Sequence, residues 1–314
     1  MDIERHIRRQ IRRSADIIGM TILASTAINY LLYPLIRRMP DYADGTLENE
    51  LLNLVLYVIV FAVPFAVGAR LSGMSGKDLL GRGRPSAEVY LMTIGLVLGW
   101  SFAAGCLGVG IESFLNQFGL TEISDSYIMP EDMATLAVQF ISVAVVPPIV
   151  EELSFRGFYL NIAERSMGTC AAICMTAICF WLAHYSIEIL PLAFGFGIIG
   201  GYIRKRYGSL LPSMCAHFAV NGIYIVINVG YAIGGDAIGT ALTLFLYLIE
   251  IFLGAVGIVL FVRNGCLLEI WRGKFGCPSR LAPGQIASAV LTSVPALLVV
   301  LLSIYFTSGY LEAL

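Results

Sequence analysis

Long apolar runs, rather than an alternation of apolar and polar positions, make up most of this sequence. A helix needs about 20 apolar residues, at about 1.5 Å each, to cross the hydrocarbon core of a bilayer. We distinguish nine runs near this length, at 15–36, 51–69, 89–111, 133–152, 168–187, 189–203, 208–232, 237–262 and 285–307. Because a spanning segment must satisfy its own backbone polar groups, and these runs do not alternate, we expect helices. The pattern predicts an all-α polytopic membrane protein.

The runs also suggest how the chain is organised. The run 189–203 is short and glycine-rich, so it is either a tight crossing or a re-entrant segment, and the bundle has eight or nine helices. The first run is longer than the apolar core of a signal peptide, so we expect it to be retained as a helix. We divide the chain into N-terminal helices with three spans (1–130), a central helix core (131–232) and C-terminal helices (233–314).

Composition and charge favour a membrane protein and argue against nucleic acid as a partner. Hydrophobic residues make up 58% of the chain and charged residues 13%, against about 45–50% and about 25% in soluble domains. The sequence has no cluster of basic and aromatic residues that would form a face of the kind that binds nucleic acid. We therefore expect a multi-pass integral membrane protein in contact with lipid, in the plasma membrane if the source is bacterial.

The loop charges alternate along the chain. The basic loops are the N-terminal arm, 70–84, 204–206 and 263–280, and the acidic loops are 41–50 and 112–132. Basic loops favour the cytoplasm. Nine spans with a cytoplasmic N-terminus place every basic loop inside and both acidic loops outside, with Arg37 and Arg38 as the main exceptions.

The stretch VVPPIVEELSFRGFYLNIAER, residues 145–165, places charges at the end of an apolar run. A charged side chain within a bilayer costs about 2.5–3.5 kcal/mol on insertion scales, so it is a candidate functional residue. On a helix Glu152 and Arg156 are four residues apart and can pair, whereas Glu151 lies about 100° around and stays free. The alternative is a helix that ends at the interface with a solvated charge cluster. We favour a helix that continues to about 165–168, because RGFYLNIAER contains good helix formers and no proline.

Two further polar clusters lie in the apolar runs that follow. His184 ends the stretch FWLAH, and taken alone it is a packing or interfacial histidine. His217 and Asn221 are four residues apart in HFAVN and share one helical face, which suits either interhelical hydrogen bonding or a functional site. The chain has only three histidines, and the third, His6, lies in the basic N-terminal arm.

Together these clusters supply the groups of a hydrolytic site. A glutamate with two histidines provides a general base that activates water, or ligands for a divalent metal. The Asn221 amide offers a hydrogen-bond donor to a developing oxyanion. The chain lacks HExxH and GxSxG, which disfavours a zincin-type site and a rhomboid-like serine site.

The three clusters resemble the motifs of a known family of intramembrane proteases. EExxxR at 151–156, FxxxH at 180–184 and HxxxN at 217–221, in successive apolar runs, are similar to the three motifs of the CAAX protease and bacteriocin-processing (CPBP) family. That family includes the eukaryotic CAAX prenyl endopeptidase of the Rce1 type and bacterial Abi-domain proteins. The resemblance covers about 130–232, and the outer helices match only in character.

The resemblance implies a role for each residue of the first two motifs. Glu151 is the implied catalytic carboxylate, which polarises a water molecule together with His184. Glu152 and Arg156 are implied to brace the site through their ion pair. The choice of which glutamate does which task is our inference from helix geometry.

The resemblance also implies a role for the third motif, a cofactor and a substrate class. His217 and Asn221 would line the site and stabilise the oxyanion. A divalent metal such as zinc, held by Glu151, His184 and His217, and a metal-free water activated by glutamate are both consistent with the family, and the sequence leaves both open. The implied substrate is a peptide or protein, with a prenylated tail, a leader peptide and a peptide pheromone as alternatives.

Two other classes of function compete with an endopeptidase. A non-catalytic Abi-type scaffold or a bacteriocin self-immunity protein would keep the motifs and act by binding a partner. A transporter would use Glu151, His184 and His217 as a proton relay, although the chain has no evident inverted repeat. We favour the protease, and the most useful test is whether its site residues converge on one water-accessible cavity.

Overall fold

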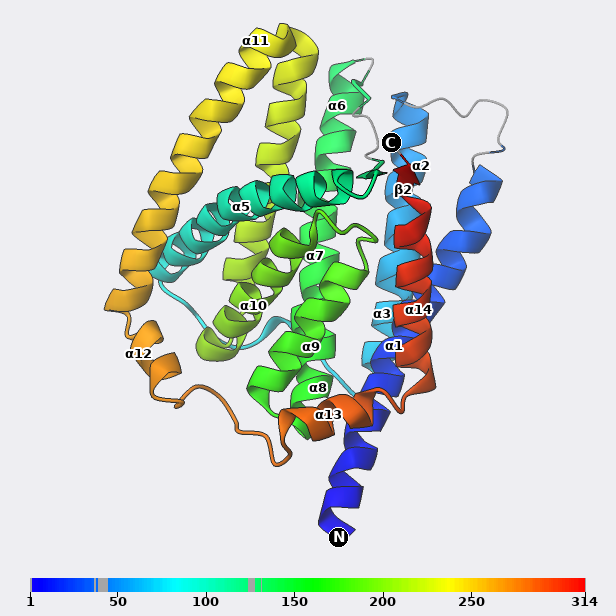
Figure 1. The fold of residues 1–314 in the computed structure, drawn as a ribbon, viewed down its shortest axis with the longest axis vertical. Coiled ribbons are helices and arrows are strands. Elements are labelled where there is room, and N and C mark those ends of the chain that lie inside the picture. Colours follow the sequence, from blue (N-terminus) through cyan, green and yellow to red (C-terminus); the bar gives the residue numbers. More distant parts are fainter. Residues whose placement is uncertain (1, 37, 39–44, 124–127, 131, 314) are drawn as a thin grey trace.

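Helices make up almost all of the computed structural model, which describes residues 2–36, 38, 45–123, 128–130 and 132–313 (Figure 1). The α-helices are α1 (Asp2–Ile36), α2 (Leu47–Tyr57), α3 (Val63–Leu71), α4 (Gly76–Leu80), α5 (Ala87–Asn116), α6 (Met133–Phe140), α7 (Val146–Glu151), α8 (Leu160–Met167), α9 (Thr169–Leu182), α10 (Leu190–Tyr207), α11 (Leu211–Arg263), α12 (Cys266–Trp271), α13 (Pro283–Val290) and α14 (Val294–Gly309). The π-helical segments lie between consecutive α-helices and are η1 (Val58–Ala62), η2 (Ile141–Val145) and η3 (Glu152–Tyr159). Two short strands, β1 (Leu120–Glu122) and β2 (Leu311–Ala313), pair antiparallel.

The described chain contains several helical stretches that are long and apolar enough to cross a membrane. Five such stretches are Ile3–Ile36, Leu47–Leu71, Ala87–Asn116, Met133–Met167 and Leu211–Arg263. A sixth exists if α13 and α14, which meet at 85°, form one bent span. The predicted all-α polytopic membrane fold is therefore confirmed.

Two predicted runs join into one element, and another is shorter than expected. The runs 208–232 and 237–262 form the 53-residue helix α11, which is broken at Gly235 with φ 65° and ψ −172°. Glycine adopts this backbone conformation without the steric penalty of a side chain. Figure 1 shows that the chain reverses at this break, so that the two arms of α11 form a hairpin whose arms diverge away from the turn. By contrast α9 is apolar but only 14 residues long, ending at Leu182 within the predicted run 168–187.

The segment Met133–Met167 forms one continuous helical stretch built from α6, η2, α7, η3 and α8. It stops at Gly168, whose φ of 81° lies in the left-handed region that glycine adopts readily. The helix therefore continues past Arg156, as predicted from the lack of a helix breaker. Glu151 consequently lies in the middle of a long helical stretch and not at its end.

Small residues bring α5 and α11 into close contact. A Cβ atom added at Gly99 would lie 2.6 Å from the Cα atom of Gly254, and one added at Gly95 would lie 2.3 Å from the carbonyl oxygen of Leu253. Helices in membranes commonly associate through small residues, because the backbones can then approach closely. The contact joins α5, in the predicted N-terminal part, to the second arm of α11, in the predicted C-terminal part. The three-part division of the chain stays a prediction.

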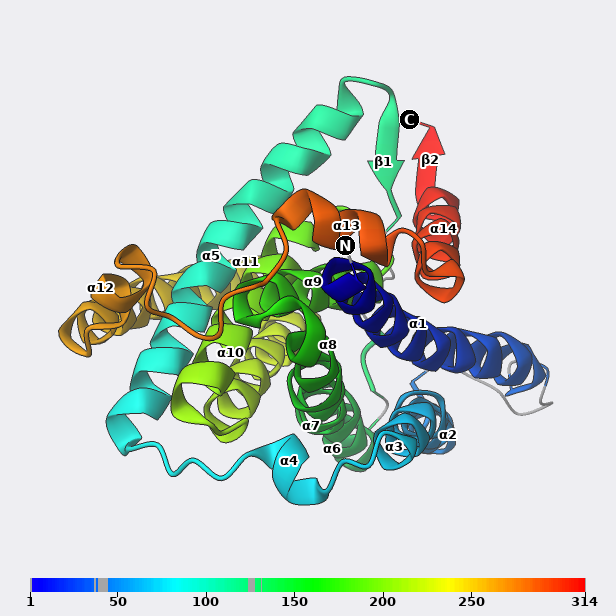
Figure 2. The same cartoon turned by 90° about the horizontal axis from the view of Figure 1, so that it is seen from below.

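The basic loops gather at one end of the molecule, which Figure 2 shows from below. The backbone N–H of Gly83 donates to the carbonyl of Gly208 at 2.8 Å, which joins the 70–84 loop to the end of α10. Arg206 pairs with Glu269 of α12, and Gln285 donates to Glu4 of α1 at 3.0 Å. This clustering agrees with the predicted alternation of loops. Which side of the membrane this end faces stays a prediction.

Candidate intramembrane active site

Glu152 and Arg156 form an ion pair in the interior of the bundle. Arg156 Nη1 lies 2.8 Å from Glu152 Oε1, and the two side chains are 2% and 0% exposed. The guanidinium also stacks over the rings of Phe180 and Phe196, at 4.2 Å and 4.6 Å from their centroids. A buried charge is tolerated only when it is paired. The predicted pairing of these two residues is therefore present.

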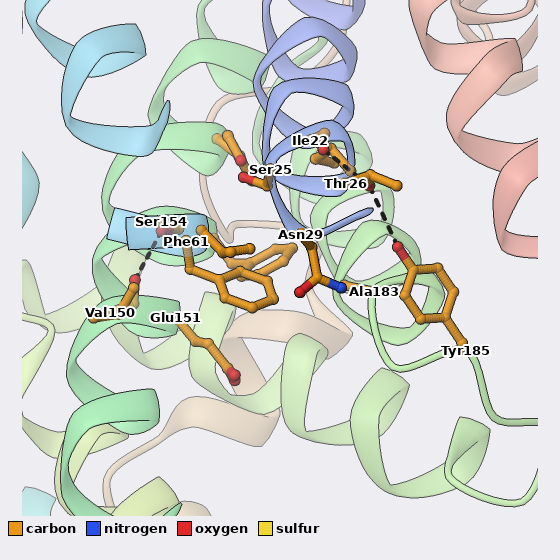
Figure 3. A pocket seen from close by; sticks show the side chains of 13 residues that line it. Ile22, Ser25, Thr26, Asn29, Phe61, Val150, Glu151, Ser154, Ala183 and Tyr185 are labelled. Carbon is orange, nitrogen blue, oxygen red and sulfur yellow. Dashed lines mark hydrogen bonds between the residues drawn. The ribbon is translucent and has the colours of Figure 1, made fainter. Parts of the chain in front are cut away.

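Glu151 has different partners from Glu152, and only one of its two oxygens accepts a hydrogen bond within the described chain. The hydroxyl of Tyr57, on α2, donates to Glu151 Oε1 at 2.7 Å. Within the described chain the other oxygen, Oε2, is buried and has no hydrogen-bond partner. The carboxylate borders a cavity of about 50 Å³ between α1, η1, α7 and the loop after α9 (Figure 3). Two adjacent glutamates thus have different surroundings, as the helix geometry predicted.

His217 lies between the two glutamates. Its Nε2 atom is 3.7 Å from Glu151 Oε2, and its Nδ1 atom is 3.5 Å from Glu152 Oε1. The ring packs edge-on against Phe196, with centroids 4.8 Å apart. These separations are longer than hydrogen bonds but short enough for an ion pair with either carboxylate when the imidazole is protonated. His217, in the first two turns of α11, therefore joins the third motif to the first.

His184 follows the end of α9 and faces a different side of the site. Its Nδ1 atom lies 2.8 Å from the carbonyl oxygen of Phe180. Because a carbonyl only accepts hydrogen bonds, Nδ1 carries the proton, and Nε2 of the neutral ring is left as an acceptor. Both residues are described, and no nitrogen–oxygen contact within 4.0 Å joins His184 to Glu151, in contrast to the Glu151–His217 contact.

The loop that carries His184 is held in place by Glu122 of β1. One carboxylate oxygen of Glu122 accepts hydrogen bonds from the backbone N–H groups of Ile187 and Glu188, both at 3.1 Å. Tyr185, next to His184, is the one described non-glycine residue with a positive φ, at 54°. Backbone in this region is strained and needs support from its surroundings. Glu122 supplies part of that support.

His184, His217 and Asn221 line a common cavity of about 270 Å³. The Asn221 side chain donates from Nδ2 to the carbonyl oxygen of Val143 at 2.9 Å. A second cavity of about 730 Å³ adjoins the first, since both are lined by His184, Val220 and Tyr224. The predicted site residues therefore form two connected groups: a charged group around Glu151 and a cavity lined by the second and third motifs, with His217 in both.

The predicted metal ligands do not gather into a metal-binding set. In the described ranges, no group of three His, Cys, Asp or Glu side chains is arranged to hold a metal ion. Glu151 and His217 are neighbours, but His184, also among the described residues, makes no nitrogen–oxygen contact with Glu151 within 4.0 Å. This arrangement does not fit a metal held by Glu151, His184 and His217.

The structure adds polar groups that the sequence analysis missed. Tyr57 lies within an apolar run, where an aromatic residue has the same pattern as a packing residue, so no signal marked it. Glu250 is buried in the second arm of α11, and as an acidic residue inside an apolar run it carried the signal that drew attention to Glu151. It lines the larger cavity near the site.

These features define an all-α polytopic membrane protein with a buried ion pair, a partly buried glutamate beside it and histidine-lined cavities among its helices. Residues 133–223 match the family model described as type II CAAX prenyl endopeptidase Rce1-like, so the predicted resemblance of this segment is confirmed. All six predicted site residues fall within the matched segment. The match supports an intramembrane protease role in general. No curated protein and no solved structure matches the chain.

Proposed function

We propose that this protein is an intramembrane endopeptidase in which Glu151 activates the attacking water. The observation that carries the proposal is the environment of the Glu151 carboxylate. Its Oε2 atom is buried without a hydrogen-bond partner among the described residues and lies 3.7 Å from His217 Nε2. Its neighbour Glu152 is neutralised by Arg156, so Glu151 is the carboxylate that remains available as a base.

The proposed reaction is the addition of water to a peptide carbonyl beside His217, which lies 3.7 Å from Glu151 and lines the cavity of about 270 Å³. Glu151 takes a proton from the water while His184 Nε2, an acceptor, helps to orient it. The water oxygen bonds to the carbonyl carbon and gives a tetrahedral intermediate. His217 and Asn221 would stabilise its oxyanion. Glu151 then returns the proton to the leaving nitrogen as the carbon–nitrogen bond breaks.

Burial of the site supports the roles proposed for Glu151 as a base and for His217 and Asn221 as oxyanion donors. Electrostatic stabilisation of a transition state is stronger where water is scarce, because the local dielectric is low. The Glu152–Arg156 pair would act on the reaction only indirectly, by fixing the helix face that carries Glu151. The Arg156 guanidinium also packs against Phe180 of α9 and Phe196 of α10, two residues that line the cavity.

The proposal is tested with purified protein in lipid nanodiscs and two sets of quenched fluorescent peptides. One set carries prenylated carboxyl-terminal tails, and the other consists of unprenylated apolar leader-like peptides. Glu151→Gln should lower kcat by about 10²–10⁴-fold, the usual contribution of a general base. Glu88→Gln is the matched control, because this carboxylate on α5 lies outside the site and pairs with Arg263.

Full cleavage by Glu151→Gln of a peptide that the unaltered protein cleaves would refute the proposal. Cleavage of neither peptide set, together with a cellular phenotype that survives Glu151→Gln, would support the non-catalytic scaffold or immunity protein instead. Cleavage of one set and not the other would assign the substrate class.

A further inference from the structure

The carbonyl of Val143 has no donor of its own in the helix. An α-helical carbonyl accepts from the N–H four residues later, and a π-helical carbonyl accepts from the N–H five residues later. For Val143 these two positions are Pro147 and Pro148. Proline has no backbone N–H, so Val143 lacks a helical partner in either register.

The local geometry shows the effect of the two prolines. The N–H of Val146 donates to the carbonyl of Ile141, five residues earlier, so η2 is wound as a π-helix directly before the prolines. A buried carbonyl without a donor is unfavourable. The Val143 carbonyl instead accepts the hydrogen bond from Asn221 Nδ2, at 2.9 Å, across to α11.

This hydrogen bond fixes which way the Asn221 amide faces. A carbonyl oxygen accepts and cannot donate, so Nδ2 and not Oδ1 must face Val143. One N–H of the amide is used in this contact. The second N–H remains for a group in the cavity that Asn221 lines. With the amide reversed, Oδ1 would face the Val143 carbonyl and repel it.

We infer that Pro147 and Pro148 are positioning residues, which orient the amide of Asn221 by freeing the Val143 carbonyl to accept from it. The prolines act on the reaction through Asn221 and touch no reacting atom. The inference rests on the proposed function, in which Asn221 donates to the oxyanion. A purely structural reading assigns the prolines to helix bending alone and leaves Asn221 as a contact between helices.

The test is the double variant Pro147→Ala/Pro148→Ala, which restores an N–H donor to Val143 in either helical register. Removing one oxyanion donor lowers kcat by about 10²–10³-fold, and we expect a misdirected donor to lower it by at least about tenfold, with KM within about twofold. Thermal stability should be unchanged or higher, because alanine favours a helix interior over proline. Pro34→Ala, at a proline inside α1 and away from the site, is the matched control.

A double-mutant cycle with Asn221→Ala distinguishes an effect of the prolines through Asn221 from a general distortion of the helix. In the Asn221→Ala background, the proline replacements should leave the residual kcat within about twofold. An equal loss in both backgrounds, or full activity of the proline variant, would overturn the inference. If the double variant does not fold, Pro147→Ala alone carries the test, since it restores the donor of the α-helical register.

The same experiments distinguish a failed inference from a failed function. Loss of cleavage in Glu151→Gln with full cleavage in the proline variant overturns the inference and leaves the protease proposal standing. Full cleavage in Glu151→Gln overturns the protease proposal itself.

Discussion

Replacing Glu152 with glutamine should strongly destabilise the protein, because Arg156 would remain buried without its partner. The pair is 2.8 Å apart, and its side chains are 0% and 2% exposed, so water cannot replace the lost carboxylate. Removing one member of a buried ion pair costs about 3–5 kcal/mol. Arg156 stacks on Phe180 and Phe196 with or without Glu152, so this contact does not change the difference, and we expect a loss of about 3–5 kcal/mol.

The assay is reversible unfolding in mixed detergent micelles, followed by circular dichroism. Glu4→Gln is the matched control, because Glu4 and Arg8 are also four residues apart and 2.9 Å from each other, but at the surface. An exposed pair contributes about 0–1 kcal/mol, so this variant should unfold almost as the unaltered protein does. The double variant Glu152→Leu/Arg156→Met should recover most of the stability, since it leaves no unpaired charge.

Two outcomes would refute the reasoning. The first is a loss in Glu152→Gln no larger than that in Glu4→Gln, which would mean that Arg156 is solvated or paired elsewhere. The second is a double variant as unstable as Glu152→Gln alone, which would mean that packing and not charge governs the position.

Three further predictions concern the site and the packing of the helices. Tyr57→Phe keeps the ring but removes the donor to Glu151 and should lower kcat several-fold with little change in KM in the peptide assay; an unchanged kcat would show that Tyr57 only packs. Gly99→Ala places a Cβ 2.6 Å from Gly254 and should lower stability by about 1–3 kcal/mol, whereas Gly105→Ala, with open space around it, should not. Dialysis against a chelator should leave cleavage unchanged, and activity that disappears and returns with added zinc would contradict the described donor geometry.

The spacing of residues along one helix was sufficient to predict the ion pair within the first motif. Residues four apart on a helix meet, so the Glu152–Arg156 pair could be read from the sequence alone. The continuation of the helix to Met167 followed from the absence of a helix breaker before Gly168. In both cases the information lies within a few turns of one helix.

Contacts between distant segments could not be predicted in the same way. The proximity of His217 to both glutamates depends on where α11 begins and how it packs, which apolar patterning does not specify. The end of α9 at Leu182 was missed because the apolar run continues, although the chain leaves the helix to form the loop with His184. Tyr57 was missed because only the fold brings it to Glu151.

The strand pair β1–β2 has a consequence for the segment that matches the family. Leu311 pairs with Glu122, the residue whose side chain holds the loop after His184, so α14 and the second motif are mechanically linked. Glu122 and Tyr57 both lie outside residues 133–223. Excising that segment would keep every motif but discard the supports of its histidine and its carboxylate. The three motifs thus lie within one segment of the sequence, whereas the contacts that support them come from both sides of it.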